Sequence, residues 1–189
     1  MQIKIRNFRP SDYKSWRAMW RDSVAHESAA LTDEAIDIGW RSIMACDAKM
    51  ILQATAENEA LLHDGGLESA APIMVVSGFV SGLAACTIEG ELIGFLHYVV
   101  HPVMGSVRPV CYLQDMYVKP AYRSQGVGRG MIDELKKMSE DADWERIYWL
   151  VKDGDVEAES FYEGRSVVVP FRVHVHPTRF LRTDVKTAG

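Results

Sequence analysis

The chain has 189 residues, of which 48% are hydrophobic and 25% charged, and its formal net charge at pH 7 is -5. This length and composition are typical of a soluble globular protein, and we expect a single domain over residues 1–189. The acidic balance and the absence of a dense run of Lys and Arg argue against a nucleic-acid binder, whose affinity depends on neutralising phosphates. A small cationic substrate is the better match.

The N-terminal third predicts one strand followed by helices. The stretch MQIKIRNFRPSD alternates apolar and polar residues as a strand does, and Pro10-Ser11-Asp12 at its end signals the start of a helix. A second helix is expected over residues 32–44, where Thr32 precedes acidic residues in the first turn. A third helix is expected to run to about Leu62.

Residues 69–88 are uncharged, about as long as a membrane span, and contain a GxxxG pattern from Gly78 to Gly82. A membrane-attached interaction domain is therefore one hypothesis. However, Pro72, the glycines, the serines and the β-branched residues suit buried strands and turns better. We expect no membrane span.

The second half of the chain predicts a mixed order of strands and helices. Two strands are expected in residues 82–101 around a turn at Glu89-Gly90-Glu91, and a third in the stretch VCYLQDMYV. After a glycine turn we expect a helix to about Asp141, a strand over 146–152, a helix over 155–164 and a strand over 171–176. This order predicts an α/β fold in which an antiparallel meander is followed by a β-α-β crossover.

The cysteines and the N-terminus indicate the compartment. Cys46, Cys86 and Cys111 are odd in number and far apart, and they lack the spacing of a disulfide framework or a zinc site. The first residues include Lys4 and Arg6 and have no apolar core of a secretory signal. We expect a cytoplasmic protein with no metal.

The glycine turn after residue 122 has the features of an anion site. Gly126 and Gly128 allow the backbone to approach an anion closely, and the following helix supplies free amides and the positive end of its dipole. A dinucleotide fingerprint would require glycine where Met131 stands, and no Walker Lys-Ser/Thr follows. A strand-to-helix turn without a ligand is the alternative.

Residues 111–162 resemble the GCN5-related N-acetyltransferase (GNAT) superfamily. Its Arg/Gln-x-x-Gly-x-Gly/Ala loop is matched by Arg123, Gly126 and Gly128, and the stretches YLQDMYV, YWLVKD and FY look most like the diamine-acetyltransferase-like branch. The resemblance implies the GNAT (acyl-CoA N-acyltransferase) fold, a mixed, mostly antiparallel central sheet flanked by helices. It also implies acetyl-CoA as co-substrate.

The resemblance further implies which residues bind acetyl-CoA. Amides of the glycine loop bind the pyrophosphate, and backbone groups of the preceding strand hold the pantetheine arm as a further strand would. The implied residues are Met116, Tyr117, Val118, Arg123, Ser124, Gln125, Gly126, Val127, Gly128 and Arg129, together with Asp155 and Ala158 of a second motif.

That second motif, Asn-x-x-Ala/Ser-x-x-x-Tyr in the family, is matched here by Asp155, Ala158 and Tyr162. The resemblance makes Tyr162 the general acid that protonates the departing CoA thiolate. The structural alternative is that Phe161 and Tyr162 only pack a helix on the sheet. Asp155 places an acceptor-only carboxylate where the family has an amide. The Lys-x-Gly-Phe that follows in the family is replaced by residues 163–166.

A primary amine must lose a proton before it attacks, because only about one molecule in two thousand is neutral at pH 7. Diamine acetyltransferases use a glutamate at the position of Gln114, which cannot act as a base. Asp115 is the nearest carboxylate, and it either orients the amine, acts through water, or is a structural acid. His97 and His101 are alternative bases.

The sequence thus predicts an N-acetyltransferase that moves acetyl from acetyl-CoA to a primary amine of a small molecule, such as a polyamine, or of a peptide. The alternative is a non-catalytic CoA-binding regulatory module of the same fold. A homodimer is a further expectation.

Overall fold

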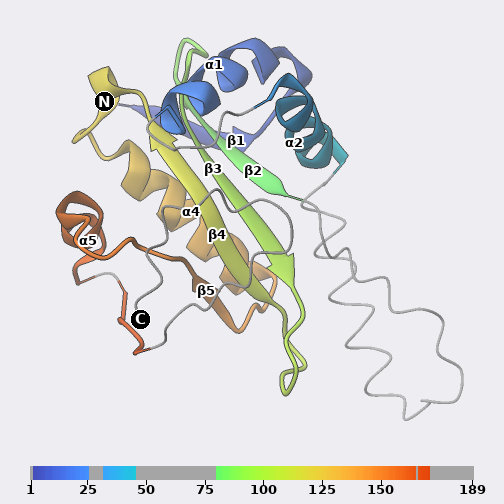
Figure 1. Cartoon of the computed structure of the whole chain (residues 1–189), viewed down its shortest axis with the longest axis vertical. Helices are drawn as coiled ribbons and strands as arrows, with labels where there is room; N and C mark the ends of the chain where they lie inside the picture. The colour runs from blue at the N-terminus through green and yellow to red at the C-terminus, as the bar shows by residue number, and fades with distance from the viewer. Residues whose placement is uncertain (1, 26–31, 46–79, 165, 171–189) are drawn as a thin grey trace, which may run out of the picture. The chain divides into compact units, whose positions relative to one another are not determined.

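The computed structural model describes residues 2–25, 32–45, 80–164 and 166–170 (Figure 1). The chain divides into two compact units, a first unit Met1–Trp149 and a second unit Leu150–Gly189. The predicted third helix and the strand predicted over 171–176 lie outside the described residues, as does Cys46. The single domain expected from the length stays a prediction.

The first unit contains a five-stranded sheet whose spatial order follows the chain order. Its strands are β1 (Ile3–Asn7), β2 (Ser81–Thr87), β3 (Leu92–His101), β4 (Val110–Val118) and β5 (Arg146–Tyr148). Neighbouring strands are antiparallel except β4 and β5, which are parallel. A parallel pair needs a crossover, which the helix between β4 and β5 provides. The predicted mixed, mostly antiparallel α/β sheet is confirmed.

Strand β5 is shorter than predicted. The apolar run of residues 149–151 suggested a strand to residue 152, but the observed strand ends at Tyr148. It pairs with β4 only from Val110 to Tyr112, and Leu150 is exposed. Strand β4 continues to Val118, so the pairing stops although β4 still has an edge to offer. Apolar composition alone therefore does not specify where a strand ends.

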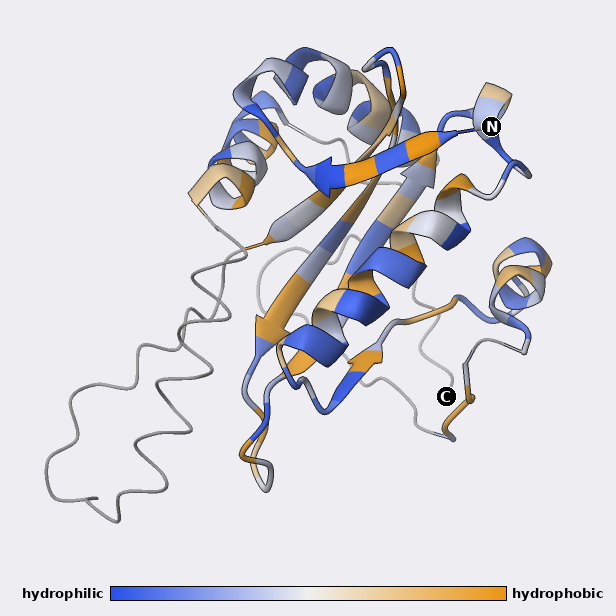
Figure 2. Cartoon of the chain, turned by 180° about the vertical axis from the view of Figure 1, so that it is seen from behind, coloured by the Kyte–Doolittle hydropathy of each residue, from blue (hydrophilic) through white to orange (hydrophobic). Residues whose placement is uncertain are grey.

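Helices cover both faces of this sheet. The helices α1 (Tyr13–Ser23) and α2 (Asp33–Ala45) pack on one face, and α4 (Val127–Asp141) crosses the other (Figures 1 and 2). As predicted, Thr32 caps α2, because its Oγ1 accepts the Ala35 amide at 3.2 Å. Figure 2 shows hydrophilic and hydrophobic residues alternating along α4, as expected for a helix with one buried side.

The core under α1 and α2 is rich in aromatic rings. Trp16 is fully buried, with its ring centroid 4.8 Å from that of Trp20 and 4.9 Å from that of Trp40. These two helices reach the sheet through this cluster, which also includes Phe8 and Phe95. Large rings bury much apolar area for few rotatable bonds, so the cluster fixes the helices on the sheet.

A partly buried ion pair links β1 to the start of α1. The Arg6 guanidinium donates to both oxygens of Asp12, at 2.6 and 2.9 Å, and the Arg9 amide donates to the same carboxylate at 2.7 Å. Burial raises the pKa of Asp12, but these hydrogen bonds outweigh it, so the pKa lies below its ordinary value. Asp12 is therefore ionised and fully paired.

The second unit contains α5 (Val156–Tyr162), which occupies most of the helix predicted over 155–164. The Asp155 carboxylate caps this helix, accepting the Ala158 amide at 3.0 Å.

The described part of the apolar segment forms β2, as the strand prediction required, while residues 69–79 lie outside the described residues. Among the described helices, none is both long enough and apolar enough to cross a membrane. Cys86 and Cys111 are buried free thiols, and burial raises the pKa of Cys111 to about 12. Neither thiol is placed to act as a nucleophile.

Candidate active site

The glycine loop between β4 and α4 brings several backbone amides together at the start of a helix. Ser124 and Gly126 have φ angles of +58° and +84°, in the left-handed region that favours glycine. The first hydrogen bond of α4 runs from the Gly130 amide to the Gly126 carbonyl at 2.9 Å. The amides that precede Gly130 therefore have no partner within the helix. Such alternation of backbone conformations at a helix N-terminus forms an anion-binding nest.

Space for a ligand is present at the centre of this loop. A Cβ built on Gly126 would meet no atom within 4 Å. Val127, next in the chain, is buried with 1% of its surface exposed and anchors the helix to the core. The loop thus combines a fixed helix start with an open backbone surface, which fits the pyrophosphate of acetyl-CoA.

Side chains brace the loop from outside. The Arg123 Nε donates to the Val118 carbonyl at 3.1 Å, and its guanidinium lies 5.7 Å from the Tyr117 ring centroid. The Gln125 amide donates to the Ala121 carbonyl at 2.9 Å. Arg123 and Gln125 were predicted among the acetyl-CoA residues, and these contacts give their side chains a bracing role.

The remaining loop residues are placed by α4. Arg129 is exposed, with its Nε 3.7 Å from the Asp133 carboxylate one turn along the helix. Gly128 lies in the first turn of α4. Their amides belong to the same N-terminal turn as that of Val127, so all the predicted loop residues are brought together.

Among the residues that the structure describes, the outer edge of β4 has no strand partner beyond its short pairing with β5. Strand β4 pairs with β3 along its length, but with β5 only at residues 110–112. The Lys119 amide donates to the Ile93 carbonyl of β3 at 2.9 Å, so by strand alternation Tyr117 also directs its polar backbone groups to β3. Met116 and Val118 direct theirs to the open edge.

This alternation refines the prediction for the pantetheine arm. Of the three strand residues predicted to hold it, Tyr117 has its backbone groups engaged by β3, while Met116 and Val118 face the open edge. The Val118 carbonyl already accepts from Arg123. Within the described part of the chain, the Met116 amide and carbonyl and the Val118 amide have no ladder partner, so an added strand-like ligand could pair with them.

Asp115 lies on β4 directly opposite His97 of β3. Its carboxylate is partly exposed, with 37% of the side-chain surface accessible, whereas His97 is buried. The His97 Nδ1 lies 3.4 Å from Asp115 Oδ2, and the Trp16 indole donates to His97 Nε2 at 2.8 Å. Sequence reasoning named Asp115 and His97 separately and missed Trp16, which lies in α1.

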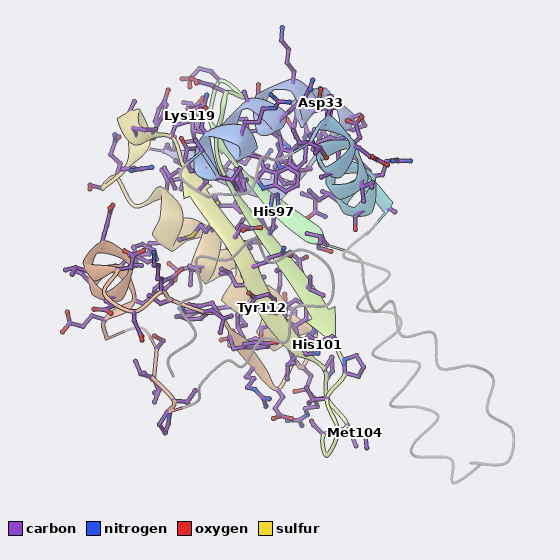
Figure 3. All side chains as sticks on the ribbon, in the orientation of Figure 1. Asp33, His97, His101, Met104, Tyr112 and Lys119 are labelled. Atoms are coloured by element: carbon purple, nitrogen blue, oxygen red, sulfur yellow. The ribbon has the colours of Figure 1, made fainter. Side chains whose placement is uncertain are left out.

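His101 lies further along β3, near Tyr112 (Figure 3), and contacts Tyr148. Its Nδ1 lies 3.0 Å from the Pro102 carbonyl, which only accepts, and its Nε2 lies 2.9 Å from the Tyr148 hydroxyl. The Tyr148 ring stacks on that of Tyr112 at 5.1 Å. Burial, followed by the nearby Asp115 carboxylate, raises the pKa of Tyr112. An aromatic surface therefore extends along the sheet from Asp115.

The second unit carries the other predicted motif. The Asp155 carboxylate and the Ala158 amide bond to each other, so the acid that replaces the family's asparagine acts as a helix cap. Tyr162 is the last residue of α5 and is partly buried. Burial raises the pKa of its hydroxyl, which favours the protonated form that a general acid needs.

In the part of the chain that the structure describes, no three His, Cys, Asp or Glu side chains form a group that could bind a metal ion.

The mixed sheet and the amide nest at the start of the crossover helix agree with the acyl-CoA N-acyltransferase fold that the resemblance implied. Residues 69–165 match the Acetyltransferase (GNAT) family, and the chain belongs to this family. It is an acetyl-CoA-dependent N-acetyltransferase.

Curated relatives are acetyltransferases. The chain is 22% identical over 161 residues to the D-amino-acid N-acetyltransferase HPA3 of Saccharomyces cerevisiae, covering 85% of this chain and 82% of the relative. It is 29% identical over 104 residues to aminoglycoside N(6')-acetyltransferase type 1 of Stenotrophomonas maltophilia, covering 50% of this chain and 67% of the relative.

Solved structures show the same fold. AAC(6')-Iy in complex with the bisubstrate analog CoA-S-monomethyl-acetylneamine has a TM-score of 0.66 at 14% identity, covering 95% of this chain and 100% of that one. A transcriptional regulator from Bacillus halodurans C-125 has a TM-score of 0.67 at 13% identity, covering 94% of this chain and 100% of that one.

Proposed function

We propose that the enzyme acetylates the primary amine of a small cationic molecule, such as a polyamine or a related amine. The observation that carries this proposal is the partly exposed Asp115 carboxylate on β4, beside the aromatic surface of Tyr112 and Tyr148. A carboxylate attracts an ammonium group, and aromatic faces attract cations and pack against apolar carbons. Relatives named for D-amino acids and aminoglycosides support a small-molecule acceptor over a peptide.

We assign the following roles to residues of the chain. The amides of residues 124–129 hold the pyrophosphate, and the backbone of Met116 and Val118 holds the pantetheine arm. Acetyl-CoA supplies the acetyl group as a thioester. Asp115 binds the ammonium group and accepts the proton that it must lose before attack. Tyr162 gives its hydroxyl proton to the thiolate that leaves.

The hydrogen bonds of the two histidines favour Asp115 over them as the base. His97 Nε2 accepts from Trp16, and the lone pair of His101 Nε2 faces the Tyr148 hydroxyl. A neutral imidazole has a single ring lone pair, so neither ring has one left for an amine. Asp115 has one oxygen next to His97 and remains partly exposed.

The test is CoA release with a panel of acceptors at fixed acetyl-CoA. We expect the highest kcat/KM among polyamines, diamines and aminoglycosides, and lower values for D-amino acids and for peptides with a free N-terminus or lysine. Turnover confined to peptides would contradict the proposal. Acetyl-CoA binding without turnover on any amine would favour the non-catalytic module.

A further inference from the structure

His97 is a buried polar residue in the centre of the sheet. It is 2% exposed, and its ring lies among the rings of Phe8, Trp16, Trp20 and Phe95, at centroid distances from 4.6 to 6.4 Å. An apolar side chain would fill this place at lower desolvation cost. Packing alone therefore does not explain why a histidine occupies this position.

We propose that His97 is a positioning residue, which Trp16 holds in one tautomer so that its Nδ1–H orients the Asp115 carboxylate toward the acceptor amine. This inference rests on the proposed role of Asp115. It assigns a function to the Trp16–His97–Asp115 chain of contacts and excludes His97 from acting as the base itself.

The tautomer follows from the partner of each ring nitrogen. An indole N–H only donates, so His97 Nε2, 2.8 Å from Trp16 Nε1, must be the nitrogen without a proton. The proton of the neutral ring is then on Nδ1, which lies 3.4 Å from Asp115 Oδ2. A protonated Nε2 would point its hydrogen at the indole hydrogen. The imidazole is thus fixed as a donor to the carboxylate.

An irregularity in the sheet brings the carboxylate to the histidine. Pairing between β3 and β4 shifts by one residue, so that His97 lies opposite Asp115 while Tyr98 lies opposite Leu113, leaving Gln114 as the extra residue. His97 and Tyr98 are adjacent in β3, so their side chains point to opposite faces of the sheet. Their partners Asp115 and Leu113 therefore also point to opposite faces, although residues two apart in a regular strand share a face. Leu113 is accordingly 4% exposed in the core.

This arrangement has a consequence for catalysis. One carboxylate oxygen is held from the buried side, and the side chain remains 37% accessible for the amine. Displacing a reacting group by about 1 Å can lower the reaction rate about a hundred-fold. A carboxylate held in one position should therefore give a higher kcat than a mobile one.

The first experiment reads the tautomer in the protein without substrate. In ¹⁵N-labelled protein we expect the His97 Nε2 to resonate as an unprotonated nitrogen and Nδ1 as a protonated one. Trp16→Phe removes the indole N–H and should shift His97 toward a mixture of tautomers. Trp20→Phe is the matched control, because its ring also lies against His97, and it should leave the tautomer unchanged. A protonated Nε2 in the wild type would overturn the proposal.

The second experiment is a double-mutant cycle on kcat. Asp115→Asn should lower kcat by about a hundred- to ten-thousand-fold. His97→Leu should lower it by about a hundred-fold with the KM for acetyl-CoA nearly unchanged. His97→Asn keeps an N–H donor near the position of Nδ1 and should recover most of the loss. In an Asp115→Asn background, His97→Leu should have little further effect, because both changes act through one carboxylate.

Each outcome decides a separate point. An equal loss from His97→Leu in both backgrounds, or no recovery by His97→Asn in a variant whose thermal unfolding matches wild type, overturns the positioning role. If Asp115→Asn keeps full turnover, both the proposed role of Asp115 and the positioning role fail. If no amine is acetylated, the proposed function fails, and the NMR result still decides whether Trp16 fixes the tautomer. If Asp115→Asn does not change the chemical shift of His97 Nδ1, the contact between Nδ1 and the Asp115 carboxylate is refuted.

Discussion

Replacing Gly126 by alanine separates the ligand-binding role of the glycine loop from its backbone strain. The φ angle of +84° costs a residue with a side chain roughly 1–2 kcal/mol in the left-handed region. The new Cβ would meet no protein atom within 4 Å, so no steric clash within the fold adds to this cost. At about 2–4 °C per kcal/mol for a chain of this size, the free protein should lose roughly 2–8 °C in Tm.

The effect on acetyl-CoA should be larger. At about a hundred times its Kd, the ligand stabilises the wild type by about 2.7 kcal/mol, or roughly 5–11 °C. The Cβ of Gly126→Ala occupies the surface that the pyrophosphate is expected to approach. If the affinity falls about a hundred-fold, the same acetyl-CoA concentration gives only about 0.4 kcal/mol, roughly 1–2 °C. Thermal unfolding with and without acetyl-CoA measures both quantities.

Gly105→Ala is the matched control. Gly105, in the loop between β3 and β4, has a φ of +86°, and a Cβ there would also meet nothing within 4 Å. It should lose the same stability without ligand and keep the full acetyl-CoA shift. Equal ligand shifts in the two variants would refute the assignment of the nest to the pyrophosphate. A loss far above 2 kcal/mol in free Gly126→Ala would refute the open geometry of the loop.

Three further predictions test other parts of the structure. Tyr162→Phe should keep acetyl-CoA affinity by calorimetry while kcat falls by about a hundred-fold or more, and unchanged kcat would remove its role. Burial raises the pKa of Tyr162, so the wild-type acid should stay protonated at neutral pH. Asp115→Asn should raise the KM for di- and polyamines more than for a monoamine of similar size, since the second charge loses part of its attraction; equal effects would show that Asp115 does not attract the second charge. Asp12→Ala leaves the partly buried Arg6 without its partner and should lower the free energy of unfolding in urea by about 1–3 kcal/mol near pH 7. Because the pKa of Asp12 is lowered in the folded state, this deficit should shrink as the pH falls below about 3.9, and a deficit independent of pH would contradict the pairing.

The sequence by itself determined the elements whose signals are local. Pro10-Ser11-Asp12 predicted the start of a helix, and α1 begins at Tyr13; the stretch VCYLQDMYV predicted β4 at its observed bounds. The spacing of Arg123, Gly126 and Gly128 predicted the nest and the start of α4. Each of these patterns is complete within one element, because helix and strand periods, glycine conformations and caps depend on near neighbours in the chain.

Only the tertiary structure decided the contacts that join elements. The end of β5 at Tyr148 depends on where the chain stops pairing with β4, which itself continues to Val118, and no apolar run can specify that point. Trp16 and His97 are 81 residues apart, and their hydrogen bond depends on how α1 packs on the sheet. Asp115 meets His97 because the β3–β4 register shifts by one residue, and such a shift changes the face of every side chain beyond it. Register and packing are properties of two elements together, and the residues of either one alone do not contain them.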